Sequence, residues 1–337
     1  MDRAAQQPLS TKGQLDASVV EHAFSRIRGA IRETPLEDVS AIFPASSAKV
    51  LCKMENLQET GSFKLRGATN KILSLSTAQA QAGVVAASNG NHGLGVAAAA
   101  KRTGIAAEVY VSEHVSAEKA RKIEQLGAKI HRVGQDPLEA ELKARAAAEQ
   151  SGRVFISPYN DIDVMAGQGT IAVELLQQTG HVDAVFVAVG GGGLIGGIGG
   201  YLKSASPGTE IVGCWPRNSP VLYESIKAGR ILDIQEEPTI SESTAGGLEP
   251  DSVTLDVCRR VIDHSVLVSE DEILTSIRLL QERKGWLIEG AAGVAVAVFQ
   301  KEAERYHGKT VAIIICGGNL SEKARGELEA HKPDFYS

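Results

Sequence analysis

The sequence predicts an α/β protein in which helices cover open parallel sheets. Short apolar runs alternate with helix-like segments along most of the 337 residues. Alternation of this kind implies parallel strands that are buried on both faces. Glycine is enriched, with 35 residues against a typical share of ~7%, and the excess lies in a few loops. No internal repeat and no low-complexity linker interrupts the pattern.

Each predicted strand is an apolar run of the kind that a buried parallel strand shows. In chain order we expect strands at 50–53, 83–87, 107–111, 130–133, 154–156, 184–189, 211–214, 266–268 and 311–315. The helical segments between them are expected at 94–101, 117–126, 138–150, 164–178 and 270–284.

Two domains are expected from the chain length, at roughly 150 residues per domain. Small apolar strand–helix units run from about residue 77 to residue 160. The sequence therefore predicts a small domain at 77–160 and a larger domain made of 1–76 and 161–337. A cleft between two α/β domains is a common place for a small-molecule ligand.

The charge pattern argues against nucleic acid and membrane partners. The net charge is −6 at pH 7, and no basic stripe of the kind that binds nucleic acid is present. No apolar run approaches the ~18 residues that a membrane span needs. Residues 1–16 carry one early arginine without an apolar stretch behind it, so no secretory signal is expected.

Cysteine and histidine usage favours a reduced, metal-free protein. Cys52, Cys214, Cys258 and Cys316 form no close-spaced pattern, which is typical of cytoplasmic proteins. The eight histidines show no metal-ligand spacing, so no metal site is expected.

Four consecutive glycines, Gly190–Gly193, follow the apolar run 184–189, and a helix is expected to start near Leu194. Glycines allow backbone amides to approach an anion closely, and a helix N-terminus adds partial positive charge. The run therefore predicts a phosphate site, although a glycine-rich packing turn would look similar. The spacing of a dinucleotide motif is present, but the acid expected about 20 residues later is missing.

Lys64 opens a helical segment just after Thr60-Gly61. A lysine at such a position is more often a solvated surface residue. However, Phe63 and Leu65 would give it apolar surroundings, and desolvation lowers the pKa of a lysine towards a reactive neutral amine. A carbonyl cofactor with a phosphate group would supply the electrophile for that amine.

Two further loops follow predicted strands. Residues 88–93, SNGNHG, precede a helix and would offer a second helix N-terminus, suited to a carboxylate; a polar turn with helix caps is the alternative. Cys316 ends the apolar strand 311–315, at the end where ligands bind parallel sheets. A plain buried cysteine would also fit there.

Together, the stretches SFKLRGA, SNGNHG, PYNDIDVMAGQGT, GGGGL and CGGN resemble the serine/threonine dehydratase and serine racemase family. They stand in that family's order and span most of the chain. The resemblance implies a two-domain, fold-type II pyridoxal-phosphate enzyme, similar to the tryptophan synthase β chain. It also implies pyridoxal 5'-phosphate as the cofactor and a homodimer.

The resemblance further implies a role for each motif. Lys64 would form the covalent link to the cofactor and later move the Cα proton. The substrate carboxylate would be bound by Ser88 and by the backbone of Asn89, Gly90, Asn91 and His92. The other cofactor contacts would be Phe63 beside the ring, the Asn91 amide at the phenolic oxygen, Gly190, Gly191, Gly192, Gly193 and the Leu194 amide at the phosphate, and Cys316 at the pyridine nitrogen.

A thiol at the ring nitrogen bears on the reaction. With a pKa of roughly 8.5 it is a weak hydrogen-bond partner and cannot stabilise a protonated pyridine as a carboxylate would. The ring then stays a modest electron sink, which favours rapid loss of a β-hydroxyl group. The expected reaction is the dehydration of a small L-3-hydroxy amino acid, such as threonine or serine, to a 2-keto acid and ammonia.

Several departures from the family pattern keep alternatives open. Asn89 replaces the serine that acts as acid and base in the racemases, and an amide cannot transfer that proton. Trp215 and Val221 stand where metal-activated members carry acidic ligands, so no metal activation is expected. The alternatives are a serine or hydroxyaspartate racemase, a hydroxyaspartate or hydroxyectoine-pathway dehydratase, a cysteine-synthase-like enzyme and a non-catalytic amino-acid binder.

Overall fold

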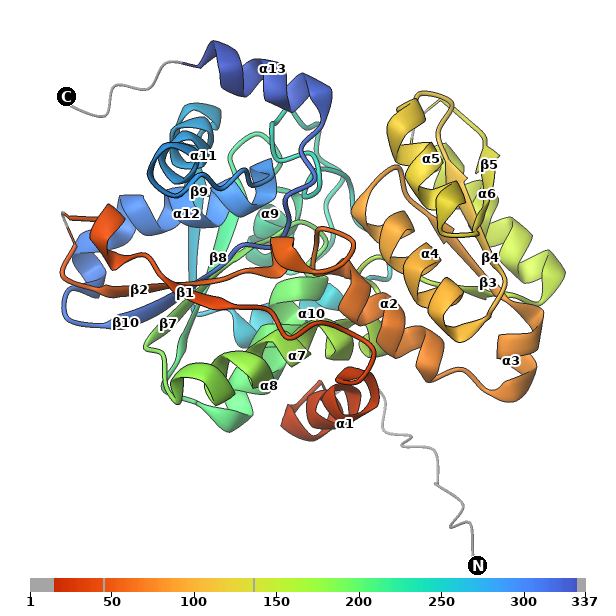
Figure 1. Cartoon of the computed structure of the whole chain (residues 1–337), viewed down its shortest axis with the longest axis horizontal. Coiled ribbons are helices and arrows are strands. Elements are labelled where there is room, and N and C mark those ends of the chain that lie inside the picture. The colour runs from red at the N-terminus through yellow and green to blue at the C-terminus, as the bar shows by residue number, and fades with distance from the viewer. Residues whose placement is uncertain (1–14, 45, 136, 332–337) are drawn as a thin grey trace, which may run out of the picture.

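The computed structural model describes residues 15–44, 46–135 and 137–331. In these ranges the strands form two separate sheets, one on each side of helix α2 in Figure 1. The expectation that the chain carries no secretory signal rests on residues 1–16, and most of these lie outside the described residues.

The larger sheet has six strands, and all neighbours in it are parallel except the first pair. Its spatial order is β1 (Leu36–Asp38), β2 (Lys49–Lys53), β10 (Thr310–Ile314), β7 (Ala184–Ala188), β8 (Glu210–Pro216) and β9 (His264–Val268). The antiparallel edge strand β1 was not predicted. Only one of its three residues is partly buried and the other two are exposed, so it shows no apolar run.

The smaller sheet has four strands, all parallel. Its spatial order is β5 (Lys129–Arg132), β4 (Ala107–Val111), β3 (Val84–Ala87) and β6 (Val154–Phe155). All nine predicted strands are confirmed, with ends that differ by no more than two residues.

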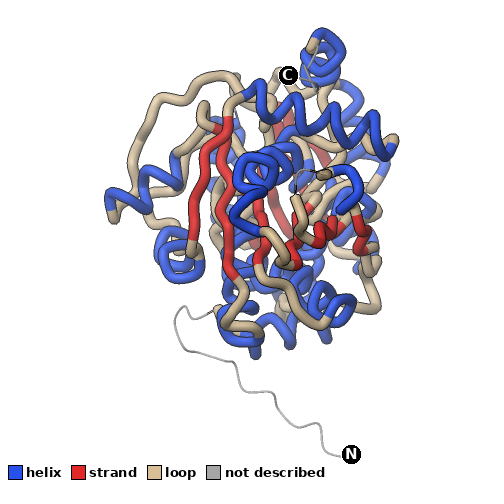
Figure 2. Tube along the Cα trace, turned by 90° about the vertical axis from the view of Figure 1, so that its left-hand side faces the viewer, coloured by secondary structure: helices blue, strands red, loops and turns tan. Residues whose placement is uncertain are grey.

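Helices lie around both sheets, as the blue and red tubes of Figure 2 show. They are α1 (Ala17–Ile27), α2 (Lys64–Leu73), α3 (Thr77–Ala82), α4 (Asn91–Thr103), α5 (Ala117–Gln125), α6 (Pro137–Ser151), α7 (Ile162–Thr179), α8 (Gly193–Ala205), α9 (Val221–Ala228), α10 (Thr254–Val261), α11 (Glu270–Lys284), α12 (Gly290–Glu302) and α13 (Glu322–Ala330).

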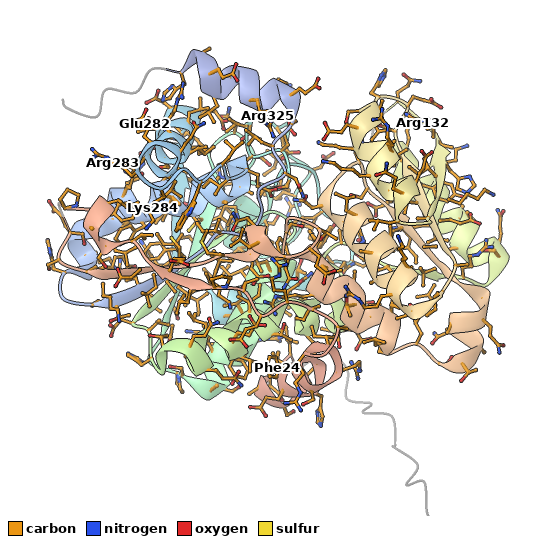
Figure 3. All side chains as sticks on the ribbon, in the orientation of Figure 1. Phe24, Arg132, Glu282, Arg283, Lys284 and Arg325 are labelled. Carbon is orange, nitrogen blue, oxygen red and sulfur yellow. The ribbon has the colours of Figure 1, made fainter. Side chains whose placement is uncertain are left out.

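Helix α11 has the bounds that the sequence predicts, because both of its ends carry strong signals. Ser269 and Glu272 form a capping box at the start, which satisfies free backbone N–H groups. Arg283 and Lys284 in the last turn complement the helix dipole and are exposed on the outer side of α11 (Figure 3).

Glycines bring the backbones of α2, α7 and α8 unusually close together. A Cβ atom on Gly197 of α8 would lie 2.1 Å from the carbonyl oxygen of Met165 on α7. A Cβ atom on Gly167 of α7 would lie 2.6 Å from the Cα of Gly67 on α2. No side chain fits in such gaps, so the helix that begins at Lys64 and the helix that begins at Gly193 are both docked against α7.

A buried ion cluster fixes the first turn of α2. Arg66 is fully buried and donates to both carboxylate oxygens of Glu55 and both of Glu174, at 2.7–2.8 Å. Lys53 donates to Glu174 and to the Thr34 carbonyl, each at 2.7 Å. Two cations therefore face two anions, and the cluster is neutral as a whole, which offsets the cost of burying each charge.

The sheets support a division of the chain, which we retain as a proposal: a small domain at 77–160 and a large domain made of 1–76 and 161–337. Every strand of the four-stranded sheet lies between residues 84 and 155, and every described strand of the six-stranded sheet lies outside that range.

The structure also bears on the expectations about cysteines, membrane spans and metal ligands. All four cysteines lie in described residues, buried and unpaired. Over the same ranges, every helix is too short or too polar to cross a bilayer. In the described part of the chain, no three His, Cys, Asp or Glu side chains gather in a way that could hold a metal ion.

Candidate active site

Lys64 is the first residue of α2, and its side chain points into the protein rather than into solvent. The Nζ atom donates to the Pro158 carbonyl at 2.8 Å and lies 5.1 Å from the centroid of the Phe63 ring. Helix α4 packs against the same turn, since a Cβ atom on Gly95 would lie 3.1 Å from the Lys64 carbonyl. The amine is thus held between α2, α4 and the 156–161 connection.

Burial makes this amine unusually easy to deprotonate. Loss of contact with water lowers the pKa of Lys64 to about 8, although Cys316 and Glu289 act in the opposite direction. An ordinary lysine has a pKa of 10.5. At pH 7 about a tenth of Lys64 is therefore the neutral, nucleophilic amine, far more than for an ordinary lysine.

The four glycines between β7 and α8 form a turn, which we call the glycine cradle (residues 190–193). Gly192 has a φ of +86°, a conformation that glycine adopts without strain. Helix α8 begins at Gly193, one residue earlier than predicted. Its first backbone N–H groups have no helical partner and carry partial positive charge, so they suit an anion.

Tyr159 connects the glycine cradle to Lys64. A Cβ atom on Gly191 would lie 2.4 Å from the Tyr159 ring, and one on Gly193 would lie 2.9 Å from the Tyr159 Cα. Since the neighbouring residue, Pro158, accepts the hydrogen bond from Lys64, the amine and the glycine cradle share one short segment. The structure thus brings together two motifs that stand far apart in the sequence.

The amide of Asn91, at the start of α4, belongs to a hydrogen-bonded group around Glu289. Asn91 donates to both oxygens of the Glu289 carboxylate, at 2.9 and 3.1 Å, and accepts from the Asn319 amide at 2.7 Å. Ser243 donates to Glu289 at 2.8 Å, and the Asn319 backbone N–H donates at 3.3 Å. Burial raises the pKa of Glu289, and these donors oppose the shift.

The 88–92 loop ends in α4, which begins at Asn91, three residues before the predicted helix start. Ser88 Oγ accepts from the Gly90 backbone N–H at 3.1 Å. The Asn89 amide exchanges two hydrogen bonds with Ser112, at 2.8 and 2.9 Å, so it is engaged within its own domain. His92 is buried, with its Nε2 atom 2.8 Å from the Ile156 carbonyl oxygen, and burial lowers its pKa to about 3.

Cys316 follows β10 and lies directly beside the segment that carries Lys64. Its carbonyl accepts from the Phe63 backbone N–H at 3.0 Å, and residues 62 and 317 form an isolated antiparallel bridge. Burial raises the pKa of the thiol well above its ordinary value. The group at this position is therefore a neutral S–H.

Two residues of the site, Glu289 and Tyr159, were assigned no role from the sequence. In the sequence Glu289 has the position of a helix-start acid, yet its side chain makes no capping hydrogen bond with α12 and turns to Asn91 instead. Tyr159 lies inside a recognised motif, but no role was predicted for it. A signal is available for each: Glu289 follows the family pattern, and Tyr159 is an aromatic residue just before a helix that starts with N-cap Asp161.

Comparison with known proteins decides the family. The model of the family described as pyridoxal-phosphate dependent enzyme matches residues 27–317. The chain belongs to the pyridoxal-phosphate-dependent enzymes. It is also similar to a protein of Thermotoga maritima named L-threonine ammonia-lyase, with 38% identity over 301 residues that cover 89% of this chain and 75% of the relative.

Solved structures agree. Maize serine racemase superposes with a TM-score of 0.86 at 28% identity, covering 93% of this chain and 96% of the racemase. The threonine deaminase of T.th. superposes with a TM-score of 0.83 at 33% identity, covering 91% of this chain and 99% of the deaminase. The predicted fold class and the resemblance to the serine/threonine dehydratase and serine racemase family are both confirmed.

The residues of the site fit pyridoxal phosphate, the cofactor of this family. The glycine cradle leaves no room for side chains at its inner positions and presents a helix N-terminus, as a phosphate requires. Within the same neighbourhood lie a lysine amine of lowered pKa, which a carbonyl cofactor requires, an asparagine amide and a neutral thiol.

Replacing Gly191 with Ala should weaken cofactor binding. The added Cβ would lie 2.4 Å from the Tyr159 ring, and overpacking of this kind costs about 1–3 kcal/mol, or about 5- to 150-fold in affinity. The measurement is the dissociation constant of pyridoxal phosphate. Gly208→Ala is the control, because nothing lies within 4 Å of its Cβ position; equal affinities in the two variants would contradict the prediction.

Proposed function

We propose that this protein is a pyridoxal-phosphate-dependent ammonia-lyase that converts a small L-3-hydroxy amino acid, such as threonine or serine, to a 2-keto acid and ammonia. The observation that carries the proposal is the partly buried, inward-pointing Lys64 amine, which is linked through Pro158 and Tyr159 to the glycine cradle. The relative named L-threonine ammonia-lyase and the deaminase structure support the same reaction.

The proposed contacts with the cofactor are those that the family resemblance implies, and the positions of the residues support them. Lys64 would hold its aldehyde carbon, and the backbone of Gly190, Gly191, Gly192, Gly193 and Leu194 would hold its phosphate. Asn91 would meet the phenolic oxygen, with its amide oriented by Glu289 and Asn319. Phe63 would pack beside the ring, and the neutral Cys316 thiol would face the ring nitrogen.

Bound pyridoxal phosphate supplies an electron-withdrawing ring that stabilises negative charge developing at the substrate Cα. The chain supplies the proton transfers and the orientation. The Lys64 amine removes the Cα proton, since its lowered pKa suits a general base near neutral pH. Ser88 and the backbone from Asn89 to His92 bind the substrate carboxylate, at the N-terminus of α4.

The charges around the site favour a substrate with a neutral side chain. The charged neighbour that acts on the pKa of Lys64 is Glu289, an anion, whereas the Cys316 thiol is neutral. Lys119 and Arg145, two cations of the small domain, already face Glu242 and Glu249. A second substrate carboxylate, as in 3-hydroxyaspartate, would stay unpaired and beside the buried Glu289, which is costly.

Racemisation is the second candidate, because a racemase is among the similar structures. It requires an acid or base on the face of Cα opposite the lysine. Asn89 carries an amide, which does not transfer protons at ordinary pH, and both of its polar ends are engaged with Ser112. This observation favours the lyase.

Keto-acid and ammonia release tests the proposed function directly. The purified protein, with added pyridoxal phosphate, is assayed with L-threonine, L-serine, 3-hydroxyaspartate and phenylserine, and the enantiomer content of the remaining substrate is measured in parallel. We expect keto acid from threonine or serine and at least about tenfold lower kcat/KM with 3-hydroxyaspartate. Enantiomer formation without keto acid would overturn the proposal in favour of a racemase.

The rate at which pyridoxal phosphate attaches to Lys64 should increase with pH. The neutral form of Lys64 is the reactive one, and its pKa in the cofactor-free protein is about 8. The rate constant for attachment should therefore rise about tenfold per pH unit below pH 8 and level off above it. Stopped-flow absorbance measures this rate; a profile still rising steeply from pH 9 to 10 would contradict the lowered pKa.

Two properties complete the proposal. We place the protein in the cytoplasm, which is supported by four unpaired cysteines, and we expect a homodimer, which is supported by the family resemblance.

A further inference from the structure

A cluster of polar side chains that has no role in the proposed reaction links the small domain to the glycine cradle. It lies between helix α6, which covers the four-stranded sheet, and the 229–253 loop that follows α9. At its centre, Arg145 of α6 and Glu249 of the loop form an ion pair, with 2.7 Å between Nη2 and Oε1. The Glu249 side chain is 15% exposed and the Arg145 side chain is 36% exposed, so the carboxylate is the better shielded of the two partners.

Arg145 is held in place from two sides besides the ion pair. Its guanidinium carbon lies 4.2 Å from the centroid of the Phe155 ring, within the range of a cation–π contact. Its Nε donates to Glu141, one turn earlier on α6, at 2.9 Å. Arg145 is therefore a fixed point of the small domain and not a freely moving surface side chain.

Glu249 extends the connection to the 157–160 segment. Its carboxylate accepts from the Asn160 amide at 2.7 Å and from Ser157 Oγ at 3.3 Å. Its backbone N–H donates to the Tyr159 hydroxyl at 3.0 Å. Tyr159 in turn packs against Gly191 and Gly193 of the glycine cradle.

We propose that Arg145 and Glu249 are positioning residues: their ion pair holds Tyr159 against the glycine cradle and thereby couples the placement of α6 to the affinity for the cofactor phosphate. The inference rests on the proposed function only in that the glycine cradle binds the phosphate. Neither residue touches the reacting atoms.

The coupling has a physical basis in the shape of the glycine cradle. The glycines have no side chains of their own, so the wall beside Gly191 is the Tyr159 ring, and the wall beside Gly193 is the Tyr159 backbone and Cβ atom. If the ring moves, the backbone N–H groups of the turn lose a neighbour that sets their direction. Anion binding by such N–H groups depends on a preformed arrangement, so a loose ring weakens binding.

A double-mutant cycle on cofactor affinity tests the proposal. The full-length holoenzyme is stripped of cofactor with hydroxylamine, and pyridoxal phosphate is titrated back into wild type, Arg145→Gln, Glu249→Gln and the double variant. Each single variant should raise the dissociation constant about 3- to 30-fold, and the double variant should be no weaker than the weaker single variant, because either change removes the whole pair.

Glu149→Gln is the matched control. It removes an exposed carboxylate of the same helix, α6, and leaves Arg145, Glu249 and Tyr159 in place, so its dissociation constant should stay within about twofold of wild type. Tyr159→Phe keeps the ring on the glycine cradle but removes the hydroxyl that meets Glu249. In the Tyr159→Phe background, Glu249→Gln should therefore lose most of its effect.

Several results would overturn the proposal. They are unchanged dissociation constants in both single variants, effects that multiply in the double variant, or an equal effect from Glu149→Gln. A lower melting temperature of the cofactor-free protein without any change in cofactor affinity would reduce the pair to a structural contact. The titration needs no turnover, so failure of the lyase reaction would leave its result intact.

Discussion

Replacing Lys64 with Ala is expected to lower kcat/KM for keto-acid release by about 10³-fold or more. General acid–base groups contribute about 10²–10⁴-fold, and this variant also loses the covalent anchor of the cofactor. Continuous measurement of keto-acid release checks the activity. Borohydride reduction followed by mass spectrometry should find the cofactor on the peptide that contains Lys64 in wild type and on no peptide of the variant.

Lys101→Ala serves as the control for this prediction, since Lys101 is an exposed residue of α4. Its activity and its cofactor adduct should match those of wild type. A Lys64→Ala variant that keeps more than a tenth of the wild-type activity, or an adduct on a different lysine of the wild type, would rule out the assigned role.

Arg66→Met should lower the free energy of unfolding by about 3–5 kcal/mol, because it leaves buried carboxylates without their partner. Glu55 loses both of its hydrogen bonds from Arg66, and Glu174 keeps only Lys53 as a cationic partner. Urea denaturation of the full-length protein measures the change. Arg121→Met, on the exposed side of α5, is the control and should stay within about 0.5 kcal/mol of wild type.

The same variant should change how stability depends on acid. Burial raises the pKa of Glu174, but the hydrogen bonds and the charge of Arg66 outweigh it and hold this pKa below the ordinary value of 4.5. The pair therefore contributes stability above pH 4.5, and this stability is lost as the pH falls through the folded pKa. Arg66→Met should flatten that loss; an unchanged acid profile, or a loss of stability below about 1 kcal/mol, would contradict the prediction.

Much of the fold was predictable because its signals are local. A strand buried on both faces is an apolar run wherever it occurs, so β3, β4 and β7 were found without knowledge of their neighbours. Lys64 and the glycine cradle were found for a similar reason, since each lies within a short motif at the start of a helix. Strand β1 was not found, because an exposed edge strand needs no apolar residues.

The residues that could not be predicted depend on contacts between distant segments. Asn91 and Glu289 are 198 residues apart, and only the closed fold shows that the carboxylate turns away from the helix that it precedes. Lys53 looked like the polar end of a strand, yet it is fully buried because Glu174, 121 residues away, neutralises it. Charge pairing between a strand and a distant helix leaves no trace in the local sequence pattern.

The strand order has a consequence during synthesis on the ribosome. The four-stranded sheet is complete once residue 155 has been added, whereas the six-stranded sheet waits for β10, which lies between β2 and β7. At ~5–20 residues per second, the 155 residues from 155 to 310 take roughly 8–30 s. From the addition of residue 188, where β7 ends, until β10 is made, β2 and β7 each present an unpaired edge, the kind of surface that aggregates, so we expect the nascent chain to need a chaperone most in that part of the interval.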